Sequence, residues 1–124
     1  MNSYLNDHPD PSSTAALHKF SEIRDPPPVR TLVFVDEHQD SIENARFVVS
    51  RPGNWIWIDF PATRHMNGAT LSYADGHAAP IRWLEPSTLR ASRNGPWIQG
   101  WVTAPGDRDL SRIYDGVPIL PSGF

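Results

Sequence analysis

The fold of this chain is decided by residues 69–84, which read ATLSYADGHAAPIRWL. Two runs of strand-forming side chains meet there at Asp75-Gly76, a dipeptide that suits a two-residue type I′ turn. We therefore predict a β-hairpin in which Tyr73 faces Ala78. Gly76 is expected to adopt a positive φ, which a residue without a Cβ atom does at little cost.

Further strands are expected around this hairpin. Residues 31–35 (TLVFV) are β-branched and aromatic, and their consecutive apolar side chains suggest a strand that is covered on both faces. Phe47–Val49 and Trp55–Ile58 are two more candidates. Pro80 lacks a backbone N–H, so the return strand of the hairpin should lie at a sheet edge or a bulge. The segment around Trp97, Ile98 and Trp101 is expected to pack as an ordered loop over the sheet.

Composition fits a single mainly β domain. The chain has 124 residues, 39% of them hydrophobic, which is enough for one modest core. Its 13 prolines and 8 glycines separate short apolar runs, which favours strands and loops over long helices. We predict an α+β head with a small antiparallel sheet and long ordered loops at 31–104. An irregular arm with a short helical segment at Thr14–Ile23 is expected within 1–30, and a divergent tail at 105–124.

Charge and composition argue against nucleic-acid partners, cysteine chemistry and membrane insertion. The net charge of −3 is spread along the chain without a basic face, so nucleic acid is not expected to bind. No cysteine is present, which excludes disulfides and thiolate chemistry. Residues 1–20 lack the features of a signal peptide, and no apolar run is long enough to insert into a membrane.

Three carboxylates follow the strand at 31–35. Asp36, Glu37 and Asp40 lie within five residues and could supply oxygen ligands to calcium. The alternative is that they form an Asx-type turn and a helix cap before Ile42. Both interpretations stay open.

Histidines offer a second kind of metal site, with zinc or iron held by His38, His65, His77 and a carboxylate such as Asp75. An extended strand between His65 and Asp75 would separate them by more than about 15 Å, so these two cannot share an ion. A site that combines His77 with the acidic cluster remains open, and a metal-dependent hydrolase is the enzymatic alternative. We nevertheless expect no catalysis, because the spacing indicates no nucleophile elbow and no paired acids in a cleft.

The tryptophans allow a binding module. Trp55 and Trp57 alternate with Ile56 and Ile58 and could present a platform for carbohydrate or protein. Packing in a core or interface is the competing interpretation, since the same alternation covers one side of a sheet.

Several segments resemble a known family. His65 is followed by nine residues and then Asp75-Gly76, and this spacing resembles the His-x9-Asp-Gly region of prepilin-type, type II secretion pseudopilin-like proteins. The segment 31–42 (TLVFVDEHQDSI) is similar to that family as well, as are DFPA at 59–62 and ADGH at 74–77. The similarity covers about residues 1–101.

The resemblance implies a structural or accessory subunit that lies outside the cytoplasm, in the periplasm or at the cell surface. Its partners would be other pilin-like subunits or further copies of itself, and calcium is implied by a looser analogy with major pseudopilins. The family's peptidase site and long hydrophobic helix have no counterpart in the sequence, so we expect a fragment or a stand-alone head domain. Because such a helix normally covers the sheet, we also expect self-association.

Overall fold

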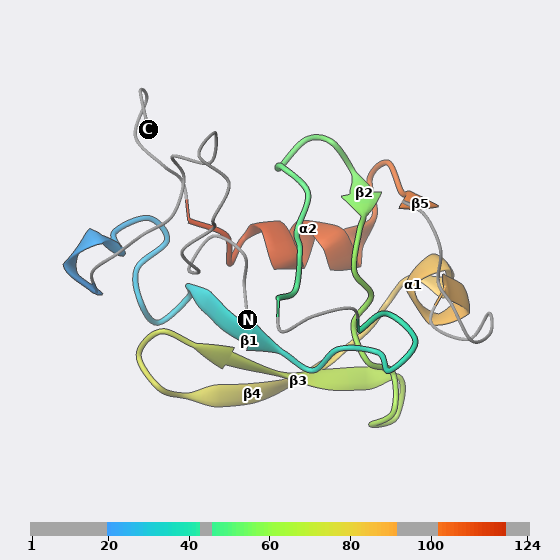
Figure 1. Cartoon of the computed structure of the whole chain (residues 1–124), viewed down its shortest axis with the longest axis horizontal. Coiled ribbons are helices and arrows are strands. Elements are labelled where there is room, and N and C mark those ends of the chain that lie inside the picture. The colour runs from blue at the N-terminus through green and yellow to red at the C-terminus, as the bar shows by residue number, and fades with distance from the viewer. Residues whose placement is uncertain (1–19, 43–45, 92–101, 119–124) are drawn as a thin grey trace.

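The computed structural model describes residues 20–42, 46–91 and 102–118 of the chain. These residues form two small antiparallel sheets and two short helices (Figure 1), which confirms the predicted α+β fold with mostly β elements. In chain order the elements are a 3-10 turn at Phe20–Glu22, β1 (Leu32–Val35), β2 (Ile56–Trp57), β3 (Gly68–Tyr73), β4 (Ala78–Arg82), α1 (Pro86–Ala91), β5 (Val102–Thr103) and α2 (Arg108–Tyr114). None of the helices within these ranges has the length and apolar character that crossing a bilayer demands.

The predicted hairpin is present as β3 and β4, but its predicted register is wrong by one residue. Ala78 pairs with Ser72 instead of Tyr73. The Tyr73 N–H donates to the His77 carbonyl at 2.9 Å, and the Gly76 N–H donates to the Tyr73 carbonyl at 2.9 Å. A type I′ turn needs positive φ at both central residues, and here only Gly76 has it, at 95°. The loop is therefore a three-residue turn that ends in a glycine bulge.

The larger sheet has the strand order β1-β3-β4, with β4 at one edge as Pro80 predicts. β1 carries a bulge, because Leu32 pairs with Tyr73 while Phe34 pairs with Ser72. The extra residue changes the alternation of side chains, so that Leu32 and Val35 are buried whereas Phe34 is 56% exposed. The prediction that both faces of residues 31–35 are covered is thus wrong at Phe34.

One face of this sheet, called the inner face below, packs against α2 and the segment 47–62 (Figure 1). Leu110 and Ile113 of α2 are each 1% exposed and join the same core as Leu32 and Leu71. The sequence predicted a loop around Trp101 and then a divergent tail, whereas residues 102–114 contain the two elements β5 and α2. Trp97, Ile98 and Trp101 lie outside the described residues, as do residues 14–19 of the predicted helical segment.

Within the described residues the second sheet pairs β2 with β5, with Ile56 opposite Thr103 and Trp57 opposite Val102. Val49 adds an isolated bridge to Trp57. The candidate strands at 47–49 and 55–58 are thus reduced to short pairings. These short pairings position Trp57 and Phe47, which are 2% and 1% exposed, in the core against the larger sheet.

Candidate functional site

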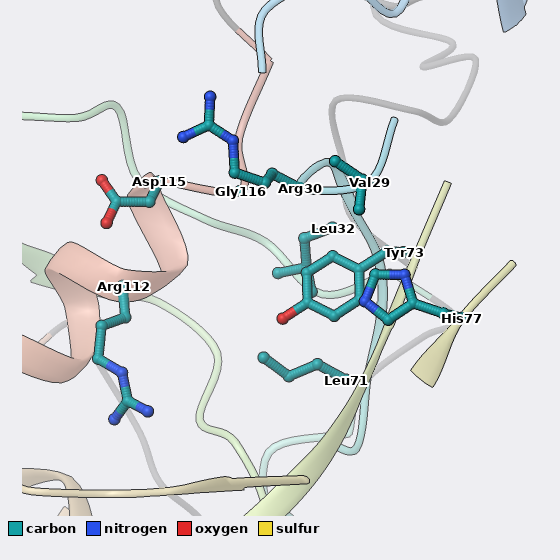
Figure 2. Close-up of a pocket in the computed structure, with 9 residues that line it drawn as sticks. All are labelled: Val29, Arg30, Leu32, Leu71, Tyr73, His77, Arg112, Asp115 and Gly116. Carbon is teal, nitrogen blue, oxygen red and sulfur yellow. The ribbon is translucent and has the colours of Figure 1, made fainter. Parts of the chain in front are cut away.

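A pocket of about 270 Å³ lies where the β3–β4 hairpin meets the end of α2 (Figure 2). Leu32 and Leu71, both from the inner face of the sheet, form its apolar floor. Tyr73 and His77 form one wall, with the Tyr73 hydroxyl directed toward the α2 side. Its other boundaries come from two segments, namely Val29 and Arg30 before β1, and Arg112, Asp115 and Gly116 at the end of α2. The head groups of these charged residues point away from the Tyr73 ring in Figure 2, so mainly their stems face the pocket.

Close contact between the backbones of Leu32 and Gly116 closes this pocket on the α2 side. The Leu32 N–H donates to the Gly116 carbonyl at 2.9 Å. A Cβ atom on Gly116 would lie 2.8 Å from the Leu32 Cβ, which is closer than such atoms can approach. Glycine at this position therefore allows the end of α2 to contact β1.

The wall of the pocket is an ordered group of three side chains. The Tyr73 and His77 rings stack with their centroids 4.4 Å apart and their planes inclined by 8°. Asp75 accepts from the His77 backbone N–H at 3.1 Å, and its carboxylate lies 2.5 Å from Nδ1 of the same histidine. This hydrogen bond from the His77 side chain is the main reason that the pKa of Asp75 lies below its ordinary value.

The contact with Asp75 determines which hydrogen bond His77 can form with a ligand. A carboxylate only accepts hydrogen bonds, so Nδ1 carries the proton that is shared with Asp75. In the neutral ring Nε2 is then an acceptor. The wall thus combines two stacked rings with a hydroxyl and one ring nitrogen that is available to a ligand.

The two ends of the His-x9-Asp-Gly motif lie at opposite ends of β3, as the strand length predicted. His65 precedes the tight turn formed by Met66 and Asn67, both at positive φ, and its N–H faces the Gly68 carbonyl at 3.4 Å. The strand begins at Gly68 and not at His65. Asp75-Gly76 forms the hairpin loop at the far end. The motif therefore specifies the two turns that flank one strand.

The acidic cluster lies at the His65 end of the sheet. Asp36 binds Arg64 and has one carboxylate oxygen 3.7 Å from Nε2 of His65. Arg64 also donates to Gln39 at 2.9 Å. The Asp36 N–H donates to the carbonyl of Thr70, in the first half of β3, whereas His77 lies beyond the last residue of that strand. His77 is therefore separated from the acidic cluster, and the possible metal site that combines them is wrong.

The remaining members of the cluster lie in a tight turn. His38 is buried, and its Nδ1 accepts from the Asp40 N–H at 3.1 Å. Glu37 is half-buried, and its backbone forms an isolated antiparallel β-bridge with that of Pro61. In the ranges that the structure describes, no three His, Asp or Glu side chains are arranged to hold a metal ion. Calcium at Asp36, Glu37 and Asp40 stays a prediction, and the turn and ion pair account for the observed contacts.

Trp55 and Trp57 pack as structural residues. Trp57 stacks on Phe60 with centroids 6.0 Å apart and donates from Nε1 to Asp107 at 3.4 Å. Trp55 is half-buried, has a φ of 54°, and contacts Tyr114 edge-on at 5.6 Å. Since Trp57 is buried in the core, these two residues do not form the shared platform that a carbohydrate-binding module requires.

Two buried carboxylates went undetected in the sequence. Asp107 caps α2 by accepting from the N–H groups of Asp109 and Leu110. Asp109 is fully buried and accepts from the N–H groups of Leu84 and Glu85 and from the Thr88 hydroxyl. The available signal was the Gly106-Asp107 turn and cap ahead of apolar residues at helical spacing.

Comparison with known proteins adds no further constraint on the site. No protein-family model, no curated protein and no solved structure matches the chain. The function is therefore argued from the residues and their geometry.

Proposed function

We propose that this chain is a non-catalytic structural or accessory subunit, similar to the globular head of a type II secretion pseudopilin or pilin-like protein. In this proposal it lies outside the cytoplasm and works through contacts with other pilin-like subunits or with copies of itself. The motif resemblance supports the family assignment. The observation that supports a role in assembly is the exposed outer face of the β1-β3-β4 sheet.

The outer face is the side of the sheet opposite α2. It carries Phe34, Thr70, Ser72, Ala78 and Pro80, together with Arg82 opposite Gly68 and Asp36 just after β1; Ser72 and Asp36 are half-buried and the others are exposed. Phe34 is the one large apolar side chain among these residues. We take this exposed aromatic ring as the anchor of the proposed contact, because a few large side chains usually carry most of the binding energy of an interface.

The edges of this sheet do not favour strand addition. Tyr73 and His77 form a hydrogen-bonded pair. Because hydrogen-bonded and non-hydrogen-bonded pairs alternate along an antiparallel ladder, the backbone N–H and C=O groups of residues 78, 80 and 82 point away from β3. Pro80 has no N–H at the centre of this free edge, which blocks a continuous ladder with another strand. On the other side, β1 and the residue after it already bond to Gly116 and Ala62. Association through the outer face is therefore favoured over association through an edge.

The arrangement of α2 also favours this use of the outer face. The family resemblance implies a long helix against one side of the sheet, and here α2 covers the inner face with Leu110 and Ile113. A second covering element would have to bind the outer face. A neighbouring subunit fits this role.

The test is localisation and incorporation in cells that produce the protein naturally. We expect the tagged chain in the extracytoplasmic fraction, cross-linked to pilin-like subunits, and we expect Phe34→Ser to reduce this cross-linking. Phe20→Ser, which removes an exposed aromatic outside the sheet, is the matched control. A chain that is confined to the cytoplasm would refute the proposal. Stoichiometric zinc or iron in the purified protein, together with hydrolytic turnover, would instead favour the metal-dependent hydrolase.

A further inference from the structure

The pocket beside Tyr73 and His77 is small, but it is large enough to hold one aromatic ring. Its volume of about 270 Å³ lies below the range of about 300–1,000 Å³ in which small-molecule sites usually fall. The apolar floor of Leu32 and Leu71 and the stacked rings of the wall favour a flat apolar group (Figure 2). One aromatic ring from another protein meets these requirements.

Phe34 provides such a ring on the opposite face of the same sheet. Its partners across the outer face are Ser72 and then Ala78, both small, so the 56% exposed ring projects beyond them. The bulge in β1 is what places Leu32 toward the pocket and Phe34 away from it. Each copy therefore carries an aromatic knob on one side and a pocket on the other.

We propose that the Phe34 ring of one copy binds in the pocket of a second copy, against Tyr73, His77 and the leucine floor. This inference rests on the proposed assembly function and specifies its contact. Because knob and pocket are different surfaces, the contact is heterologous, and repetition produces a head-to-tail ring or open chain of subunits instead of a symmetric dimer.

Charges near the two surfaces are compatible with this contact. Arg30 and Asp115 border the pocket. Asp36 follows Phe34 by two residues on the outer face and binds Arg64. The pocket border also carries Arg112, so each surface carries charges of both signs and opposite charges can meet across the contact.

The experiment uses two variants with complementary defects. Phe34→Ser removes the knob and leaves the pocket intact. Val29→Glu places a charge at the pocket, at a position that is 52% exposed, and leaves the knob intact. Phe20→Ser is the control, because Phe20 is 63% exposed and belongs to neither surface. Circular dichroism establishes that each variant is folded.

Light scattering over a concentration series then decides the result. We expect the native chain and Phe20→Ser to form species that grow with concentration, and each of the other variants to associate at least about tenfold more weakly, as loss of an anchor predicts. An equimolar mixture of Phe34→Ser and Val29→Glu retains one intact knob and one intact pocket. It should form a one-to-one dimer and grow no further.

Three outcomes would overturn the inference. These are a native chain that stays monomeric, a Val29→Glu variant that associates like the native chain, and a mixture that remains monomeric. The second outcome would indicate symmetric contact through the outer face, which leaves the proposed assembly function intact. Absence of the chain from extracytoplasmic assemblies in cells would contradict the proposed function, whatever the scattering result.

Discussion

Replacing Asp109 with alanine is expected to destabilise the whole domain, although the residue lies in a short helix near the end of the described chain. Its carboxylate accepts from the Leu84 N–H at 2.9 Å, the Glu85 N–H at 2.9 Å and the Thr88 hydroxyl at 2.8 Å. Arg112 approaches the same carboxylate at 3.4 Å. Asp109 thereby fixes the segment that leads from β4 into α1 against α2.

The size of the effect follows from the three hydrogen-bond donors that alanine leaves without their acceptor. Three donors in a buried or half-buried region would lose a charged acceptor, and breaking a buried charged network by removing one partner costs about 3–5 kcal/mol. In urea unfolding, a slope of about 1–3 kcal/mol per M converts this loss into a midpoint that is lower by more than about 1 M. Asp109→Asn retains one acceptor oxygen and should lose less than Asp109→Ala.

The matched control is Asp115→Ala, which removes an exposed carboxylate just after the same helix and should change the free energy of unfolding by no more than about 0.5 kcal/mol. Fluorescence and circular dichroism would follow the unfolding of all three variants. If Asp109→Ala shifted the midpoint no further than Asp115→Ala, the reasoning that this carboxylate joins α1 to α2 would be refuted.

Two further predictions concern the ends of β3. The hydrogen bond from His77 lowers the pKa of Asp75 below 3.8, so its contribution to stability is present above about pH 4 and is lost as the pH falls through the lowered pKa. His77→Ala should return the Asp75 pKa toward 3.8 in an NMR titration, and an unchanged pKa would disprove this cause. Gly68→Ala should lower the melting temperature strongly, because its Cβ would lie 2.1 Å from the Ile81 carbonyl oxygen. Gly53→Ala, which meets no atom within 4 Å, should cost only about 1 kcal/mol for its positive φ, and equal losses at both glycines would contradict the steric argument.

Local chemistry explains which parts of the fold were predictable. Asp75-Gly76 identified the hairpin and Pro80 identified its edge strand, since both effects act within a few residues of the chain. The register was not predictable from them. An Asp-Gly pair is compatible with loops of two or three residues, and the observed φ values select the longer loop with positive φ at Gly76 alone.

The candidate site was predictable only in part. Asp75 and Gly76 were recognised through the motif, but their neighbour His77 gains its role from stacking on Tyr73 and from the end of α2 that closes the pocket. The helix itself was missed because its seven residues form a short segment in a tail with no recognised counterpart. Asp109 was missed because the groups it binds lie more than twenty residues earlier in the chain.

The sequence by itself determined local elements of this protein: the hairpin turn at Asp75-Gly76, an edge strand that contains proline, and short strands between glycines and prolines. Such features depend on backbone torsions and side-chain volume within a few neighbouring residues. Only the tertiary structure decided that a bulge directs Leu32 inward and Phe34 outward, and that α2 covers the inner face. These results depend on competition among distant apolar groups for the same buried space, which no local pattern records.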